Sequence, residues 1–254
     1  MATAIGLAVT AVVLLLGAAF ARRRAPRPVP ACLLVSGVLV GLSATVFALV
    51  ARDETLADTD APVLGVMVAE RTPGRTDLAE AASLFGGTVA TGGLAVLAAL
   101  VLALRGRRSR AVVWVGAVAV GSLTIRLLKT AVERARPPVD TRLAVETSAS
   151  LPSGHALMSA LGVGLTVVAL LVLLRDAGRT HSVVRGAIVL VGALIVLLIG
   201  TSRVYLGVHW TTDVLAGWML GGALLGLAVA LAATLERRPS EIHPSKGSVD
   251  APVA

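Results

Sequence analysis

The stretch PSGHALMSALGVGLTVVALLVLL, residues 152–174, decides the fold class. From residue 154 onward it is almost entirely apolar, and a helix needs about 17 to 25 such residues to cross the hydrocarbon core of a bilayer. Ser153 precedes the apolar run and is a favourable residue for capping a helix N-terminus. The stretch therefore predicts a membrane-spanning helix that begins beside a polar Ser-Gly-His sequence.

Six further apolar runs predict a polytopic membrane protein. They cover residues 3–21, 31–51, 86–104, 111–128, 186–201 and 212–235. The chain of 254 residues is 56% hydrophobic, and its mean hydropathy of +0.87 is far above that of an ordinary soluble domain. The sequence therefore predicts an all-α bundle of transmembrane helices, in which the short run at 186–201 either continues toward Tyr205 or crosses the membrane with little tilt.

Clusters of arginine predict how these helices are oriented. Arginines gather at residues 22–27, 105–110 and 175–185, which the positive-inside rule assigns to the cytoplasm. Segment 52–85 holds seven acidic residues against three arginines, and we expect it to form short interfacial helices on the opposite side. The net charge of +8 comes largely from the cytoplasmic loops, so orientation and anionic lipid explain it better than nucleic acid does.

The polar segment SRVYLGVHWTTD, residues 202–213, combines a cation, a histidine and a carboxylate just before the last apolar run. His209 and Asp213 are four residues apart, a spacing that places two side chains on one face of a helix. The carboxylate can then hold one ring nitrogen while the other meets a substrate, which makes His209 a candidate nucleophile.

Two other polar segments are predicted on the same extracytoplasmic side. In KTAVERARP, residues 129–137, Lys129 and Arg136 are seven residues apart, about two helical turns, so both can point at one anion. In PSGH, Ser153 stands before a helix whose positive N-terminal end suits an oxyanion. His155 lies in the first turn of that helix and can donate a proton to a leaving oxygen.

Each of these motifs also has a simpler explanation. Cations at a helix end often only snorkel to the interface, a serine often only caps a helix, and a histidine near an aspartate is often a structural hydrogen bond. Arg126 and Arg134 are assigned to that simpler class and receive no role. The joint occurrence of three motifs on one side of the membrane favours a phosphate-transfer site.

The three motifs, in this order and spacing, resemble the signature of the type-2 phosphatidic acid phosphatase and vanadium haloperoxidase superfamily, over about residues 85–235. The resemblance implies three catalytic residues, His209, Asp213 and His155. It implies five phosphate-binding residues, Lys129, Arg136, Ser153, Gly154 and Arg203. His209 would attack phosphorus, Asp213 would orient it, and His155 would protonate the leaving group, with no metal or other cofactor.

The resemblance further implies a six-span core, formed by the helix near 31–51 and a catalytic region at 86–235. The helix at 3–21 would be an addition, so residues 1–30 form an N-terminal helix with a basic cytoplasmic loop. Cleavage as a signal peptide after residues 19–21 is the alternative. Residues 31–235 form the phosphatase domain, and the polar tail at 236–254 is expected to be disordered.

The expected function is hydrolysis of a phosphorylated lipid at the outer face of the plasma membrane, through a phosphohistidine. Phosphatidic acid, phosphatidylglycerol phosphate and polyprenyl diphosphates all suit such a site, and the motifs do not choose among them. A lipid phosphotransferase with the same residues is an open alternative. A non-catalytic phospholipid-binding or transport protein is another, whereas a haloperoxidase fits the hydrophobic spans poorly.

Overall fold

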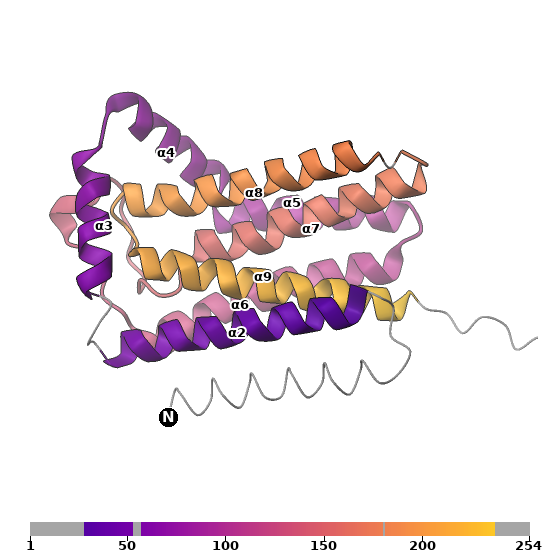
Figure 1. The fold of residues 1–254 in the computed structure, drawn as a ribbon, viewed down its shortest axis with the longest axis horizontal. Helices are drawn as coiled ribbons and strands as arrows, with labels where there is room; N and C mark the ends of the chain where they lie inside the picture. The colour runs from indigo at the N-terminus through magenta and orange to yellow at the C-terminus, as the bar shows by residue number, and fades with distance from the viewer. Residues whose placement is uncertain (1–27, 53–56, 180, 237–254) are drawn as a thin grey trace, which may run out of the picture.

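The computed structural model describes residues 28–52, 57–179 and 181–236, which form a bundle of long helices lying side by side (Figure 1). Its helices are α2 (Pro28–Arg52), α3 (Ala57–Ala69), α4 (Pro73–Phe85), α5 (Thr88–Leu104), α6 (Arg108–Val132), α7 (Gly154–Asp176), α8 (Ser182–Tyr205) and α9 (Thr211–Leu235). A 3-10 turn, Val139–Thr141, lies between α6 and α7, and the described ranges contain no β-strand. The predicted all-α helical bundle is confirmed.

Five of these helices, α2, α6, α7, α8 and α9, are long and apolar enough to cross a membrane. Helices α4 and α5 meet at a bend of 50° and pass the same test together. The short apolar run at 186–201 does continue to Tyr205, because α8 extends it in both directions. The expected helix at 3–21, the basic segment at 22–27 and the tail from residue 237 lie outside the described residues.

Helix α7 lies at the centre of the bundle and packs against α5, α6, α8 and α9. Its buried residues Leu157, Met158, Leu161 and Leu165 meet small side chains of α5 and α9 and the indole of Trp114 in α6. That indole nitrogen is satisfied within the core, since it donates a hydrogen bond to the carbonyl oxygen of Leu165 at 2.9 Å. Helix α2 packs on the outside, mainly against α9.

Two glycines allow α9 to approach the start of α7 closely. A Cβ atom at Gly217 would lie 2.7 Å from the carbonyl oxygen of Ser153 and 2.9 Å from the Cβ of Ala156. At Gly221, one turn later, a Cβ atom would lie 2.8 Å from the Cβ of Ala160. Small residues at these positions bring the two backbones together, as is common between helices in membranes, and they fix the beginning of α9 beside the PSGH segment.

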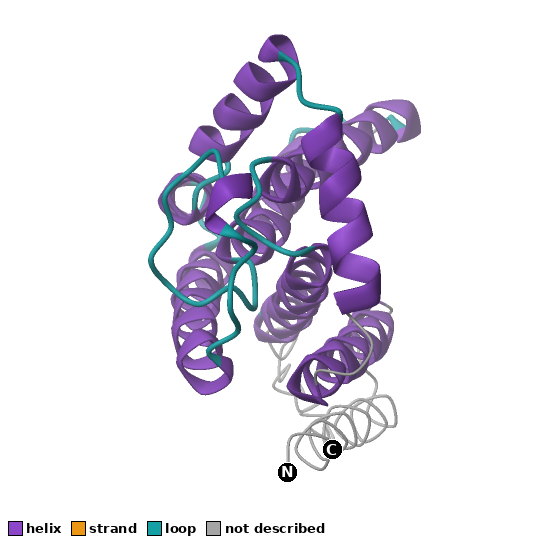
Figure 2. Ribbon diagram, turned by 90° about the vertical axis from the view of Figure 1, so that its left-hand side faces the viewer, coloured by secondary structure: helices purple, strands orange, loops and turns teal. Residues whose placement is uncertain are grey.

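The polar motifs meet at one end of the bundle. Figure 2 looks onto this end, where the loops that follow α6 and α8 gather beside the short helices. Arg71, between α3 and α4, ties the loops together, because it donates hydrogen bonds to the carbonyl oxygens of Tyr205 and Thr141. The arginine-rich turns between α5 and α6 and between α7 and α8 lie at the opposite end (Figure 1). The three polar motifs therefore lie together at one end of the bundle, as the arginine pattern predicted.

Candidate active site

His209 and Asp213 form the predicted pair, although not by the predicted geometry. Helix α9 begins at Thr211 with Trp210 as its N-cap, so His209 lies in the preceding turn and not on the helix. The backbone N–H of Trp210 donates to Asp213 Oδ2 at 2.9 Å and curls this turn over the carboxylate. As a result, His209 Nδ1 lies 3.4 Å from the same oxygen, and both side chains are almost fully buried.

The two ring nitrogens of His209 have different surroundings. Nδ1 faces the Asp213 carboxylate, which can only accept a hydrogen bond, so Nδ1 carries the proton and Nε2 keeps a free lone pair. Nε2 lies 3.4 Å from Nη1 of Arg136. Burial lowers the pKa of His209 to about 4, although the hydrogen bond to Asp213 opposes that shift. The ring is therefore a neutral base at pH 7 with its free nitrogen beside a cation.

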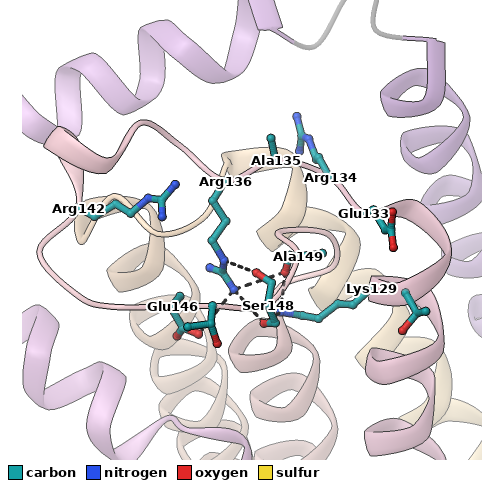
Figure 3. Close-up of a pocket in the computed structure, with 11 residues that line it drawn as sticks. Lys129, Glu133, Arg134, Ala135, Arg136, Arg142, Glu146, Ser148 and Ala149 are labelled. Atoms are coloured by element: carbon teal, nitrogen blue, oxygen red, sulfur yellow. Dashed lines mark hydrogen bonds and ion pairs between the residues drawn. The ribbon is translucent and has the colours of Figure 1, made fainter.

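Lys129 and Arg136 converge on one short segment, as predicted. The expectation that they do so along one helix was wrong. Helix α6 ends at Val132, and the left-handed conformation of Glu133, with φ of 49°, turns the chain so that Arg136 lies in the loop. The Nζ of Lys129 donates to the hydroxyl of Ser148 at 2.9 Å, and the Nε of Arg136 donates to the carbonyl oxygen of Ser148 at 2.7 Å (Figure 3).

Arg203, at the end of α8, is connected to Arg136 through a carboxylate. Its side chain is only 2% exposed and donates hydrogen bonds to Ser83 of α4 and to Oε1 of Glu146. Oε2 of Glu146 lies 3.6 Å from Nη2 of Arg136. Burial by itself raises the pKa of Glu146, but the charges of Arg203 and Arg136 outweigh that effect and leave the pKa below its usual value. Glu146 therefore stands between two of the predicted phosphate-binding cations as an anion.

The PSGH segment supplies the N-terminus of α7. The hydroxyl of Ser153 accepts a hydrogen bond from the N–H of Ala156 at 3.4 Å, so Ser153 is the helix cap that the sequence predicted. The N–H of Ser153 donates to the carbonyl oxygen of Asp213 at 3.0 Å. A Cβ atom at Gly154 would lie 3.4 Å from Oγ1 of Thr88 in α5. The start of α7 is thus held against both the first turn of α9, which carries Asp213, and the start of α5.

His155 lies in the first turn of α7, on the side of the α4–α5 bend. Its Nε2 is 3.9 Å from the position that a Cβ atom of Gly87 would occupy. It is close enough to Arg203, Glu146 and His209 for their charges to act on it. The eight residues predicted for the site therefore gather at one end of the bundle.

Besides Glu146, three residues around Asp213 were missed in the sequence. The hydroxyl of Ser150 donates to Asp213 Oδ2 and lies 3.5 Å from His209 Nδ1. Arg134 forms ion pairs with Asp213 and with Asp60 of α3. The sequence gives Arg134 no role, although it lies only two residues before Arg136, and Asp60 is one of the seven acidic residues of segment 52–85. Neither helical periodicity nor motif spacing gives a signal for such contacts between distant loops.

A pocket of about 560 Å³ opens at this end and is lined by several charged side chains (Figure 3). They are Lys129, Glu133, Arg134, Arg136, Arg142 and Glu146. His209, His155 and Arg203 are not part of the lining, and Arg136 and Glu146 connect the pocket to them through the contacts described above. The excess of cations over acids in the lining suits an anionic headgroup.

Comparison with known proteins assigns this fold and site to a family. Residues 110–237 match the sequence profile of the PAP2 superfamily. The match covers half of the chain and includes all three motifs, so the protein belongs to the PAP2 superfamily. The resemblance inferred from the motifs is therefore confirmed.

Two relatives and one solved structure show what this chain is similar to. Phosphatidylglycerophosphatase B of Bacillus subtilis (strain 168) is 40% identical over 96 residues, which are 38% of this chain and 45% of that protein. Undecaprenyl-diphosphatase of Sulfolobus acidocaldarius is 35% identical over 88 residues, 35% of this chain and 36% of that protein. The matched regions thus span less than half the length of these relatives.

The solved structure is a transmembrane PAP2 type phosphatidylglycerolphosphate phosphatase from Bacillus subtilis. It superposes with a TM-score of 0.68 at 23% identity and covers 78% of this chain and 98% of that one. Together with the apolar helices, this likeness identifies the chain as a multi-pass membrane protein with the transmembrane PAP2 fold.

Proposed function

We propose that the protein is an integral membrane phosphatase that removes a phosphate from a phosphomonoester or diphosphate lipid. The observation that carries the proposal is the position of His209, a buried neutral base with Nδ1 on a carboxylate and Nε2 beside Arg136. An oriented histidine among cations has the arrangement of a nucleophile for phosphorus.

In the first step, the Nε2 lone pair of His209 attacks phosphorus and forms an N–P bond while the bond from phosphorus to the lipid oxygen breaks. Asp213 stabilises the charge that develops on the ring, because its oxygen accepts the Nδ1 hydrogen bond. His155 donates its proton to the departing oxygen. A phosphomonoester thereby releases the lipid alcohol, and a lipid diphosphate releases the lipid monophosphate. The product of this step is a phosphohistidine.

In the second step, a water molecule attacks the phosphohistidine. His155, now neutral, takes a proton from that water, the N–P bond breaks, and inorganic phosphate leaves. His209 returns to its neutral form and His155 to its protonated form. The same two residues therefore serve both half-reactions with no net change in the protein.

The cations stabilise the charge that spreads over the phosphoryl oxygens in both steps. Arg136 is the nearest of them to His209 Nε2, and Lys129 and Arg203 flank it through Ser148 and Glu146. The capped start of α7 adds free N–H groups and the positive end of a helix dipole. The substrate phosphate must displace Glu146 from the two arginines before it can reach them.

We also propose that this end of the bundle faces the extracytoplasmic side of the plasma membrane. The arginine-rich turns lie at the opposite end of the bundle, and the positive-inside rule assigns such turns to the cytoplasm. The site then lies at the level of the outer headgroups, where it can reach a lipid phosphate. The names of the two relatives make phosphatidylglycerol phosphate and undecaprenyl diphosphate the first candidates, with phosphatidic acid as a third.

Phosphate release by the purified full-length protein in detergent tests this proposal, with each of the three lipids supplied in turn. We expect release without an added acceptor and its loss in His209→Ala. His181→Ala is the matched control, because His181 is exposed at the start of α8, at the other end of the bundle. A folded protein that releases no phosphate, or that only transfers the phosphoryl group to an added acceptor alcohol, contradicts hydrolysis. Wild-type turnover in His209→Ala removes His209 as the nucleophile.

A further inference from the structure

Arg134 bridges two buried carboxylates that come from different parts of the chain. Its Nη2 donates to Asp60 Oδ2 at 2.8 Å, and its Nη1 donates to Asp213 Oδ1 at 2.5 Å. The Asp60 side chain is 1% exposed and that of Asp213 is not exposed at all. A fork of two nitrogens is required for this contact, because a single ammonium group does not span two separate carboxylates with the same geometry.

The same cluster holds the first turn of α9 from several sides. Asp60 Oδ1 accepts from the N–H of Thr212 at 3.0 Å, and Asp60 Oδ2 accepts from its hydroxyl at 2.6 Å. Arg134 also donates to that hydroxyl at 2.8 Å. The guanidinium carbon lies 5.8 Å from the ring centre of Trp210, within the range of a cation–π contact. The residues that directly follow His209 are therefore held in place by Arg134 and Asp60.

Arg134 also meets Asp213 through a second route. The carbonyl oxygen of Arg134 accepts a hydrogen bond from the N–H of Ser150 at 2.9 Å, and the hydroxyl of Ser150 donates to Asp213 Oδ2. Asp213 Oδ1 is thus held by the side chain of Arg134, while Oδ2 is held by Ser150, the N–H of Trp210 and His209. With four groups directed at its two oxygens, the carboxylate has little freedom to rotate away from the histidine.

Charge accounts for the presence of Asp60. A single arginine beside Asp213 would neutralise the carboxylate that His209 depends on, whereas an arginine shared between two carboxylates leaves the three groups with one net negative charge. Buried charges of this kind are costly unless they are paired and hydrogen-bonded, and each of the three is. The cluster therefore keeps a negative field at His209 without leaving an unpaired buried charge.

We propose that Arg134 and Asp60 are positioning residues that hold Asp213 against His209 and set the negative charge that His209 experiences. Both terminal nitrogens of Arg134 are already engaged by buried carboxylates, so Arg134 is poorly placed to bind substrate phosphate. Lys129 is better placed, because its Nζ binds only a hydroxyl and a carbonyl oxygen. The catalytic part of this inference rests on the proposed function. The other charged and titratable groups facing the His209–Asp213 pair are Lys129, Arg136, Glu146, His155 and Arg203.

The alternative is that the cluster only fastens α3 to α9. Titration of His209 distinguishes these two roles. A contact that only joins α3 to α9 is not expected to change the titration midpoint of His209. NMR of the full-length protein with ¹³C-labelled histidine in detergent follows the ring directly, and the His209 signal is identified by its loss in His209→Ala. Steady-state phosphate release gives kcat and KM for the same samples.

In Arg134→Gln we expect the titration midpoint of His209 to rise by about one pH unit, because a nearby positive charge has been removed. We expect kcat to fall on the order of a hundredfold through lost orientation, with KM within about twofold of wild type. Arg134→Lys should keep the midpoint but recover only part of kcat, since it restores the charge and not the fork. Adding Asp60→Asn to Arg134→Gln removes the excess negative charge and should return the midpoint toward wild type.

Arg126→Gln is the control, because Arg126 is exposed on α6 and should change neither quantity. If Arg134→Gln does not fold, the single variant Asp60→Asn tests the proposal instead. In Asp60→Asn we expect the titration midpoint of His209 to lie below that of wild type, because a nearby negative charge has been removed. An unchanged His209 midpoint in whichever of these two variants folds overturns the proposal and leaves the cluster as a structural fastening. A wild-type protein that releases no phosphate contradicts the proposed function, and the NMR titrations still decide whether the cluster sets the charge at His209.

Discussion

Glu146 forms an ion pair with Arg203, whose guanidinium is almost completely buried. Its second oxygen lies 3.6 Å from Arg136, so one carboxylate engages two arginines that are proposed to bind substrate phosphate. Carboxylate and phosphate compete for guanidinium groups through the same charge-assisted hydrogen bonds. Glu146 is therefore expected to act as a competitor for every anion that enters the site.

Glu146→Gln should strengthen binding of anions, because the amide keeps the shape of the side chain but loses the competing charge. We expect the inhibition constants of inorganic phosphate and orthovanadate to fall by about tenfold, or ~1.4 kcal/mol of binding free energy. Inhibition of phosphate release gives both constants. Glu133→Gln is the control, because Glu133 lines the same pocket and forms no ion pair with the residues that the structure describes. Equal inhibition constants in Glu146→Gln and wild type would show that the carboxylate does not compete.

Asp213→Asn should lower kcat by a factor on the order of 10³ to 10⁴, as loss of the orienting carboxylate does in other histidine-dependent sites. An amide can donate to Nδ1 as well as accept from it, so the tautomer with a free Nε2 is no longer favoured. The variant loses charge but keeps its size, so we expect its thermal unfolding to remain cooperative. Steady-state kinetics beside a melting curve separates loss of function from loss of fold. Activity within tenfold of wild type would remove Asp213 from the orienting role.

The pH dependence of kcat/KM should have its acidic limb near pH 4. His209 must be neutral to attack, and its pKa is lowered by burial to about 4, so activity is retained above that value and falls as the ring gains a proton below it. The position of this limb belongs to the coupled site rather than to His209 alone. An acidic limb near 6.5, the value of an exposed histidine, would contradict a buried, neutral His209.

The fold was largely predictable because each spanning helix must satisfy its own backbone and bury an apolar surface in lipid. Runs as uniform as 154–174 and 212–235 therefore became α7 and α9 with only small changes at their ends. The ends were less predictable, since a few residues of left-handed or capping conformation decide them. Glu133 ends α6 before Arg136, and Trp210 delays the start of α9 until after His209.

The candidate site was predictable where the motif supplied the residue types and unpredictable where loops meet. Lys129 and Arg136 were expected to converge along a helix, and they converge through the loop at Ser148 instead. Glu146 and Arg134 both lie in the long connection between α6 and α7. This connection has no regular periodicity, so its sequence does not show which way a side chain points. Their partners are remote in sequence, so only the folded arrangement of α3, α8 and α9 identifies them.

EDTA should leave phosphate release unchanged. In the proposed mechanism Lys129, Arg136 and Arg203 supply the positive charge that stabilises the phosphoryl oxygens, so no step depends on a divalent cation. The assay uses detergent-solubilised protein with excess EDTA, with and without added magnesium, on the best of the three lipids. A clear loss of activity that magnesium restores would contradict the metal-free mechanism while leaving the role of His209 open to its own test.

Gly217→Ala should disturb the site from a position that touches no substrate. A Cβ atom there would lie 2.7 Å from the carbonyl oxygen of Ser153, so the start of α9 must move away from the start of α7. Overpacking of this kind costs about 1 to 3 kcal/mol, and we expect a lower unfolding temperature. We also expect kcat to fall by about tenfold or more, because the displaced segment carries Asp213 and small misplacements of catalytic groups reduce rates strongly.

Gly93→Ala on α5 is the matched control, because nothing lies within 4 Å of a Cβ atom at that position. Alanine is favoured over glycine inside a helix by about 1 kcal/mol, so this variant should be at least as stable as wild type and equally active. Thermal unfolding and phosphate release of both variants in one detergent provide the comparison. If Gly217→Ala melts and turns over like Gly93→Ala, the close approach of α9 to α7 is not what holds Asp213 in place beside His209.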